Sequence, residues 1–89
     1  VEKDHGKALG WYLKSAQGGN ASAQFRAAHM YLKGEGGEQD DASAYIFFSL
    51  AAAKDFPKAA KLRDKAAKKL SREELADAKE LVSRALGSQ

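Results

Sequence analysis

Residues 20–53 decide the fold, and they read NASAQFRAAHMYLKGEGGEQDDASAYIFFSLAAA. Ala, Leu and other strong helix formers dominate the segments 21–33 and 41–54. Residues that favour strands because they are β-branched are almost absent from both segments. The glycine-rich segment Gly34-Glu35-Gly36-Gly37 separates them. The stretch therefore predicts two helices joined by a turn.

These two helices are apolar around most of their circumference. Between residues 42 and 53 the only polar side chains besides that of Tyr45 are two serines. A helix that packs on one side needs only one apolar stripe, so both helices require neighbours on several sides. At about 100° per residue, four polar side chains of the first helix fall in one narrow stripe, and nearly all its other side chains are apolar. This stripe consists of Ser22, Arg26, His29 and Lys33.

The rest of the chain predicts three more helices, at about residues 5–17, 57–69 and 72–86. Helix starts are marked by Asn20 and Asp40 as side-chain caps, by Pro57 in a first turn, and by a Ser71–Glu74 capping box. Gly18 and Gly34 are expected as left-handed helix ends. The last helix has one apolar stripe and one charged face, which is typical of an end cap. The apolar stripe consists of Leu75, Ala78, Val82 and Ala85.

Length and composition exclude several classes of protein. A chain of 89 residues is expected to form one domain, residues 1–89. It has no cysteine, which excludes disulfides and thiolate metal sites. No apolar run approaches the roughly 20 residues of a membrane span, and no signal peptide pattern is visible. The chain starts at Val1, so we expect that upstream sequence has been removed; the cellular compartment stays open.

The sequence also repeats itself. A shift of 36 residues overlays part of the chain on itself, and repeats of this length that hold a helix pair indicate an α-solenoid. One helix pair cannot bury its own apolar faces, so neighbouring pairs must stack. The shift places Asp4 on Asp40, Ala8 on Ala44, and the aromatic pair Trp11-Tyr12 on Phe47-Phe48.

The segment from Ala23 to Tyr31, followed by Gly34-Glu35-Gly36, Asp40 and Ala44, resembles the Sel-one-like repeat (SLR), a relative of the tetratricopeptide repeat (TPR). The resemblance implies a superhelical, TPR-like scaffold for protein–protein contact of a kind often found in bacterial proteins. It divides the chain into the second helix of a truncated repeat (4–19), a complete repeat (20–55), and a degenerate terminal repeat with a capping helix (56–89). Gly37, Ala28 and Asp64 depart from the usual pattern.

Chemistry-bearing motifs are scarce. His5 and His29 are the only imidazoles and have no metal-ligand spacing. The glycine-rich turn lacks the strand and the Gly-Lys-Ser/Thr ending of a phosphate loop. The paired carboxylates at 40–41 and 73–74 lie at helix starts, where they complement the helix dipole. We therefore predict no catalytic residue, no cofactor, no metal and no small-molecule substrate, and thus a protein that is not an enzyme.

Charge gives the best functional prediction. In the helix expected at 57–69, five lysines share an arc of about 100°, namely Lys58, Lys61, Lys65, Lys68 and Lys69. First helices line the concave surface in TPR-like solenoids, so this arc and the polar stripe of helix 21–33 would form one groove. A cationic groove suits an acidic peptide or a free C-terminal carboxylate of a protein partner. The candidate contacts are Arg26, His29, Lys33, Lys58, Lys65 and Lys69.

Alternative interpretations remain open. The lysines could simply keep the chain in solution, or the segment could be a structural cap of a longer solenoid. Nucleic-acid or anionic-surface binding would give steep salt dependence, but exposed aromatic residues interleaved with basic ones are absent. The first helix would expose an apolar face if its partner helix were missing, which would favour self-association. The aromatic residues Trp11, Tyr12, Phe47 and Phe48 are expected to pack in the core rather than to form a recognition platform.

Overall fold

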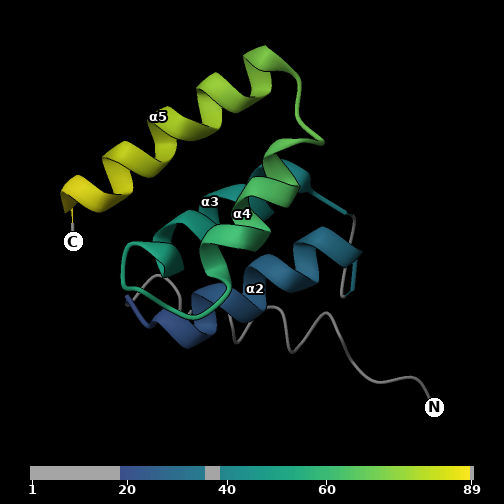
Figure 1. The fold of residues 1–89 in the computed structure, drawn as a ribbon. Helices are drawn as coiled ribbons and strands as arrows, with labels where there is room; N and C mark the ends of the chain where they lie inside the picture. Colours follow the sequence, from purple (N-terminus) through teal and green to yellow (C-terminus); the bar gives the residue numbers. More distant parts are fainter. Residues whose placement is uncertain (1–18, 36–38, 89) are drawn as a thin grey trace.

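A computed structural model describes residues 19–35 and 39–88 of the chain. It shows four helices, which follow one another as α2 (Ala21–Lys33), α3 (Asp41–Ala52), α4 (Ala59–Ala67) and α5 (Arg72–Ser88) (Figure 1). The described part contains no strand, so the predicted all-α solenoid class is confirmed. The helix predicted at 5–17, with His5, Trp11, Tyr12 and Gly18, lies outside the described residues.

Side-chain caps fix the starts of three helices, as predicted. The Asn20 side chain accepts a hydrogen bond from the Ala23 amide at 2.9 Å. Asp40 accepts one from the Ser43 amide at 3.0 Å. Before α5, the Ser71 amide donates to the Glu74 carboxylate at 2.8 Å, and the Glu74 amide donates to the Ser71 hydroxyl at 3.0 Å. Each cap satisfies first-turn amides that the helix itself cannot pair.

Helices α2 and α3 end with the same backbone conformation. Gly34 closes α2 in the left-handed region (φ 77°), and the Glu35 amide donates to Met30 O. After α3, Asp55 takes the same conformation (φ 60°). The amides of Asp55 and Phe56 reach back to the carbonyls of Ala52 and Ala51. This is the Schellman arrangement, which favours glycine at the position that Asp55 occupies.

The turn before α2 and the turn after α3 are related by the 36-residue shift. Gly19 (φ 89°) lies 36 residues before Asp55, and both adopt the left-handed conformation. The two turns also touch, because Lys54 Nζ donates a hydrogen bond to the Gly19 carbonyl. The repeat therefore requires a left-handed residue at this position, where the second copy has an aspartate instead of a glycine.

The predicted bounds of the fourth helix were wrong at both ends. Helix α4 runs from Ala59 to Ala67, whereas residues 57–69 were expected to be helical. Pro57 lies in the preceding turn, and Lys58 has a left-handed φ of 68° and provides no side-chain cap. The 36-residue shift explains the late start of α4. It places Phe56 at the position of the α2 cap Asn20, and the Phe56 side chain has no hydrogen-bond acceptor.

Helix α3 is the centre of the packing, and α2, α4 and α5 all contact it. Phe48 is fully buried, and Phe47 packs against the core while partly exposed, so both phenylalanines pack as predicted. In Figure 1, α4 lies in front of α3, α2 lies below them, and α5 runs above them. The central cluster draws on all four helices and consists of Ala28, Leu32, Ala44, Tyr45, Phe48, Ala66 and Ala78.

Helix α5 is buried on one side only. Ala78 is 2% exposed, and Leu75 and Val82 pack partly buried against the core. Leu81 and Leu86 are 50% and 40% exposed. The predicted one-sided helix is thus confirmed. Across the described ranges, no helix is both long enough and apolar enough to cross a membrane.

Candidate functional site

The exposed surface of α2 is the polar stripe that the sequence predicts. The Asn20 cap sets the start of α2, so Arg26, His29 and Lys33 follow at spacings of three and four residues and share one side. Arg26 and Lys33 are exposed, and His29 is half-buried. Most other side chains of α2 are covered. The buried residues are Ala23, Gln24, Ala27, Ala28, Met30 and Leu32.

The lysines around α4 do not form the single helical arc that was predicted. Of the three candidate contacts there, only Lys65 lies within the helix. Lys58 and Lys69 lie in the turns before and after it, because α4 is shorter than expected. All three are exposed. The corrected picture is a helix with basic residues on its outer side and at both ends.

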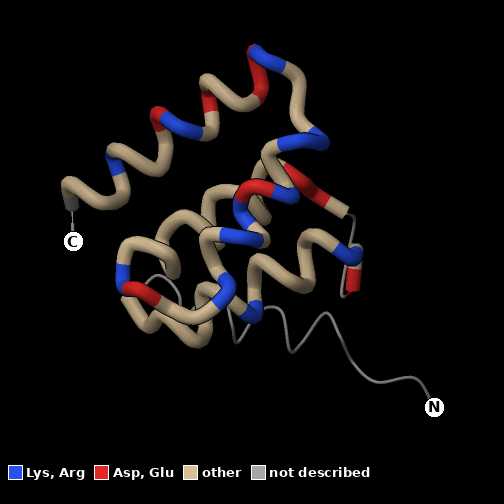
Figure 2. The backbone as a smooth tube through the Cα atoms, viewed as in Figure 1, with Lys and Arg blue, Asp and Glu red and all other residues tan. Residues whose placement is uncertain are grey.

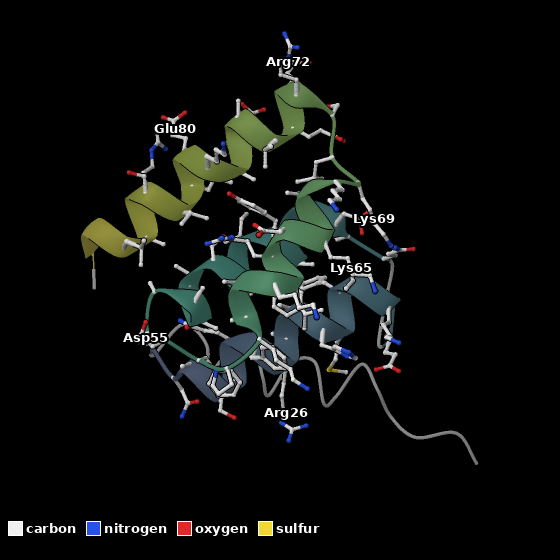
Figure 3. The ribbon with its side chains drawn as sticks, viewed as in Figure 1. Arg26, Asp55, Lys65, Lys69, Arg72 and Glu80 are labelled. Carbon is white, nitrogen blue, oxygen red and sulfur yellow. The ribbon has the colours of Figure 1, made fainter. Side chains whose placement is uncertain are left out.

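Lys65 lies on the edge of α4 that borders the core. It follows Leu62 by three residues, so the two side chains share one face of the helix. Leu62 packs, partly buried, against the cluster to which Ala28 and Leu32 of α2 belong. Lys65 lies on α4 and Lys69 in the turn after it, whereas Arg26 projects outward from the lower edge of α2 (Figure 3). The structure therefore does not bring Arg26 next to these two lysines.

A cluster of aromatic rings joins α2 to the turn before α4. The Phe25 ring lies 4.9 Å from the Phe56 ring, centroid to centroid, and meets the Phe48 ring edge-on at 5.4 Å. The His29 ring stacks on Phe25 at 6.5 Å with an interplanar angle of 25°. Arg26 follows Phe25 in the chain, and Lys58 follows Phe56 by two residues. The cluster thus packs α2 against the segment that leads to Lys58 and α4.

Phe25 and Phe56 were not singled out from the sequence as site residues. Both are half-buried, as is His29. The available signal was the 36-residue shift, which sets Phe56 at the position of Asn20, a place where an aromatic side chain cannot cap a helix. A residue that breaks a repeat pattern in this way is a candidate for a different role.

Positive charge is concentrated around α4 and is largely uncompensated. Residues 54–69 contain seven basic residues and two acidic ones. Within the described part of the chain, the ion pairs are Arg63–Asp64 and Arg84–Glu80. Figure 2 shows basic positions along α4 and at both of its ends, with an acidic position within α4, whereas α5 carries both kinds. Arg26, Lys33, Lys58, Lys65 and Lys69 therefore face solvent without an ionic partner among the described residues.

The carboxylates that could suggest acid–base chemistry have structural partners instead. Asp40 accepts hydrogen bonds from the Ser43 amide and, at 2.8 Å, from the Ser43 hydroxyl. Glu74 completes the capping box of α5. Asp40 and burial together raise the pKa of Tyr31, burial being the larger cause. Residues 19–35 and 39–88 contain no group of His, Asp and Glu side chains that could hold a metal ion.

These features define a class, that of short helical-repeat proteins in which helix pairs stack around a shared core. Residues 1–20 and 21–56 match the model of the Sel1 repeat family, and the chain belongs to that family. Repeats of this fold generally mediate protein–protein interaction and are typically non-catalytic scaffolds.

Two bacterial proteins illustrate the relationship. The alginate biosynthesis protein AlgK of Pseudomonas syringae pv. tomato is 36% identical over 78 residues, which is 88% of this chain and 17% of the relative. The crystal structure of a protective antigen present in uropathogenic Escherichia coli strains displays an SLR fold. It matches this chain with a TM-score of 0.88 and 30% identity, over 98% of this chain and 19% of that one. The chain therefore spans less than a fifth of both relatives.

Proposed function

We propose that this chain is a non-catalytic interaction module that binds an acidic segment of a partner protein. The binding surface, called here the α2–α4 face, consists of Arg26, His29, Lys33, Lys58, Lys65 and Lys69. One observation carries the proposal: five of these side chains are exposed cations with no ionic partner among the described residues. An acidic segment would supply the missing counter-charges through charge-assisted hydrogen bonds.

The affinity expected from charge alone is weak. Exposed ion pairs contribute roughly 0.2–1 kcal/mol each, because water screens them and two flexible side chains must be ordered. Five such pairs would give about 1–5 kcal/mol, which corresponds to dissociation constants of about a millimolar or weaker. The predicted interaction should therefore weaken as salt concentration rises.

The decisive test removes charge from two faces in equal amount. Lys65→Ala with Lys69→Ala takes two charges from the α2–α4 face, and Arg72→Ala with Lys79→Ala takes two from exposed positions on α5. Fluorescence anisotropy with a labelled oligoglutamate peptide measures binding. We expect the first double variant to weaken binding markedly and the second to change it little, with both melting temperatures near that of the wild type.

Equal losses for the two double variants would contradict the proposal. They would mean that only net charge matters, as expected if the lysines serve solubility. The same series with a labelled DNA duplex separates the nucleic-acid alternative. That alternative requires tighter binding to DNA than to oligoglutamate and a steep loss of affinity with salt.

The one-sided burial of α5 supports a second role, that of a structural cap. Ala78→Glu would place a charge at a position that is 2% exposed and would detach α5 from α3. If α5 only stabilises the fold, this variant should melt at a lower temperature but bind oligoglutamate as the wild type does below that temperature. Loss of binding in the folded variant would instead place α5 in the binding surface.

A further inference from the structure

We infer that the partner segment carries an aromatic or other large apolar side chain beside its carboxylates, and that this side chain docks on the rings of Phe25, His29 and Phe56. The inference rests on the proposed function and deepens it, because it names the kind of segment that the α2–α4 face selects. The three residues are called the ring cluster below.

The ring cluster packs on a buried side chain and is partly exposed on its other side. Phe48, which is fully buried, meets Phe25 edge-on from below at 5.4 Å. Phe25 in turn contacts the rings of Phe56 and His29. All three rings of the cluster are half-buried, so each keeps part of its surface in water. Because Phe48 fixes Phe25, an incoming side chain would meet rings that are already ordered, which lowers the entropic cost of binding.

The surroundings of the ring cluster resemble the anatomy of a protein-binding surface. Energetically important contacts in such surfaces are apolar or aromatic at the centre, with a polar rim. Here Arg26 lies three residues before His29 on the same face of α2, and Lys58 lies two residues after Phe56 in the turn before α4. Both cations are exposed and unpaired with any described carboxylate. An apolar side chain on the rings would therefore bring neighbouring carboxylates toward these cations.

The protein contains a second aromatic pair that serves as an internal contrast. Tyr31 and Phe47 stack with centroids 6.0 Å apart and an interplanar angle of 3°. Both are half-buried, as the ring cluster is. The pKa of Tyr31 is raised by burial and, to a smaller extent, by the nearby carboxylate of Asp40. An acidic segment would be repelled there, so the charge around the rings, and not ring exposure alone, selects the ring cluster.

The test compares three labelled peptides: oligoglutamate, the same peptide with one central Phe, and the same peptide with Ser in that place. We expect the Phe peptide to bind the wild-type chain about tenfold more tightly than the Ser peptide, which is 1.4 kcal/mol. Phe56→Leu, which keeps an apolar side chain but removes a ring that lies outside the α2–α4 face, should remove most of this advantage while leaving the affinity for the Ser peptide almost unchanged. Tyr31→Ala, the matched control on α2, should preserve the advantage.

Phe25→Leu provides a second test if Phe56→Leu fails to fold, since it also keeps an apolar side chain but removes a ring of the cluster. It should reduce the preference for the Phe peptide. Equal binding of the Phe and Ser peptides to the wild type would overturn this inference, yet leave the proposed function standing if oligoglutamate still binds through Lys65 and Lys69. Failure of all three peptides to bind would overturn the proposed function itself.

Discussion

Helices α3 and α5 show two ways in which a helix belongs to this fold. Helix α3 contacts α2, α4 and α5, and six of its twelve residues are buried. Helix α5 has seventeen residues, and Ala78 is the one buried residue among those whose side chains are described. Both begin with a side-chain cap that closes on the third residue after it. Their difference therefore lies in packing and not in local helix chemistry.

The contacts that stabilise the fold and the proposed binding surface therefore lie in different parts of the repeat. The stabilising apolar surface is concentrated where α3 meets its neighbours, as stacked repeats require. The uncompensated charge lies on the outer sides of α2 and around α4. Substitutions on α3 should consequently act on folding, and those on the α2–α4 face on binding.

The largest expected effect comes from emptying the centre of the core. Phe48→Ala removes a ring with no exposed surface and should lower the free energy of unfolding by about 3–5 kcal/mol. Leu81→Ala on α5 should cost less than about 1 kcal/mol, because Leu81 is half exposed. Urea unfolding followed by circular dichroism measures both. Similar losses for the two variants would break the contrast between α3 and α5.

Loss of a cap should lower the free energy of unfolding by about 1 kcal/mol, the usual cost of replacing a capping side chain by alanine. The effect on the rest of the fold should differ between α3 and α5. Asp40→Ala and Ser71→Ala remove equivalent bonds. Because α5 packs on one side only, we expect Ser71→Ala to accelerate amide hydrogen exchange in α5 alone. Asp40→Ala should accelerate exchange in all the helices that contact α3. If Asp40→Ala accelerates amide exchange in α3 alone, α3 is not the centre of a cooperative unit.

The turn that follows α3 allows a matched pair with opposite charge. Asp55→Gly and Lys58→Gly each place glycine at a left-handed residue, which relieves strain and should stabilise the fold by a few tenths to about 1 kcal/mol. Their effects on oligoglutamate binding should be opposite. Removing Asp55 should strengthen binding, and removing Lys58 should weaken it.

Thermal melts and anisotropy titrations on the same samples check this pair. A change of binding in the same direction for both variants would show that turn geometry, and not charge, governs the α2–α4 face. A marked loss of stability in either variant would contradict the left-handed conformation at that residue.

The smallest expected effect concerns Tyr31 of α2, which stacks on Phe47 of α3. Burial and Asp40 raise the pKa of Tyr31 above its ordinary value of 10.0, so the folded state favours the neutral phenol. The stability that follows is fully present below pH 10.0 and is lost as the pH rises above it. Tyr31→Phe should therefore lose less stability than the wild type when urea unfolding is measured on either side of that pH. Parallel losses would exclude this contribution.

Much of the fold was predictable because it depends on local chemistry. The caps Asn20, Asp40 and Ser71 and the left-handed Gly34 follow from side-chain acceptors and from glycine's freedom at positive φ. The apolar circumference of α3 predicted its central place. The predicted start of α4 was wrong, because propensity favours a helix through Pro57 and Lys58 whereas the packed Phe56 ring and the left-handed Lys58 delay it.

The candidate site was predicted less completely. Arg26, His29 and Lys33 share the predicted stripe, since helical spacing fixes it. The division of Lys58, Lys65 and Lys69 between a helix and its flanking turns was not foreseen. The binding roles of all six residues stay a prediction, as do the unit boundaries 4–19, 20–55 and 56–89.

The sequence by itself determined the helices, their caps, the family and the excess of positive charge after residue 53. Each of these depends on contacts between residues a few positions apart, or on composition alone. The tertiary structure decided which rings meet, where α4 begins, and which cations remain without a counter-charge. Those outcomes depend on contacts between residues far apart in the chain, such as that of Phe25 with Phe56, which no local spacing can specify.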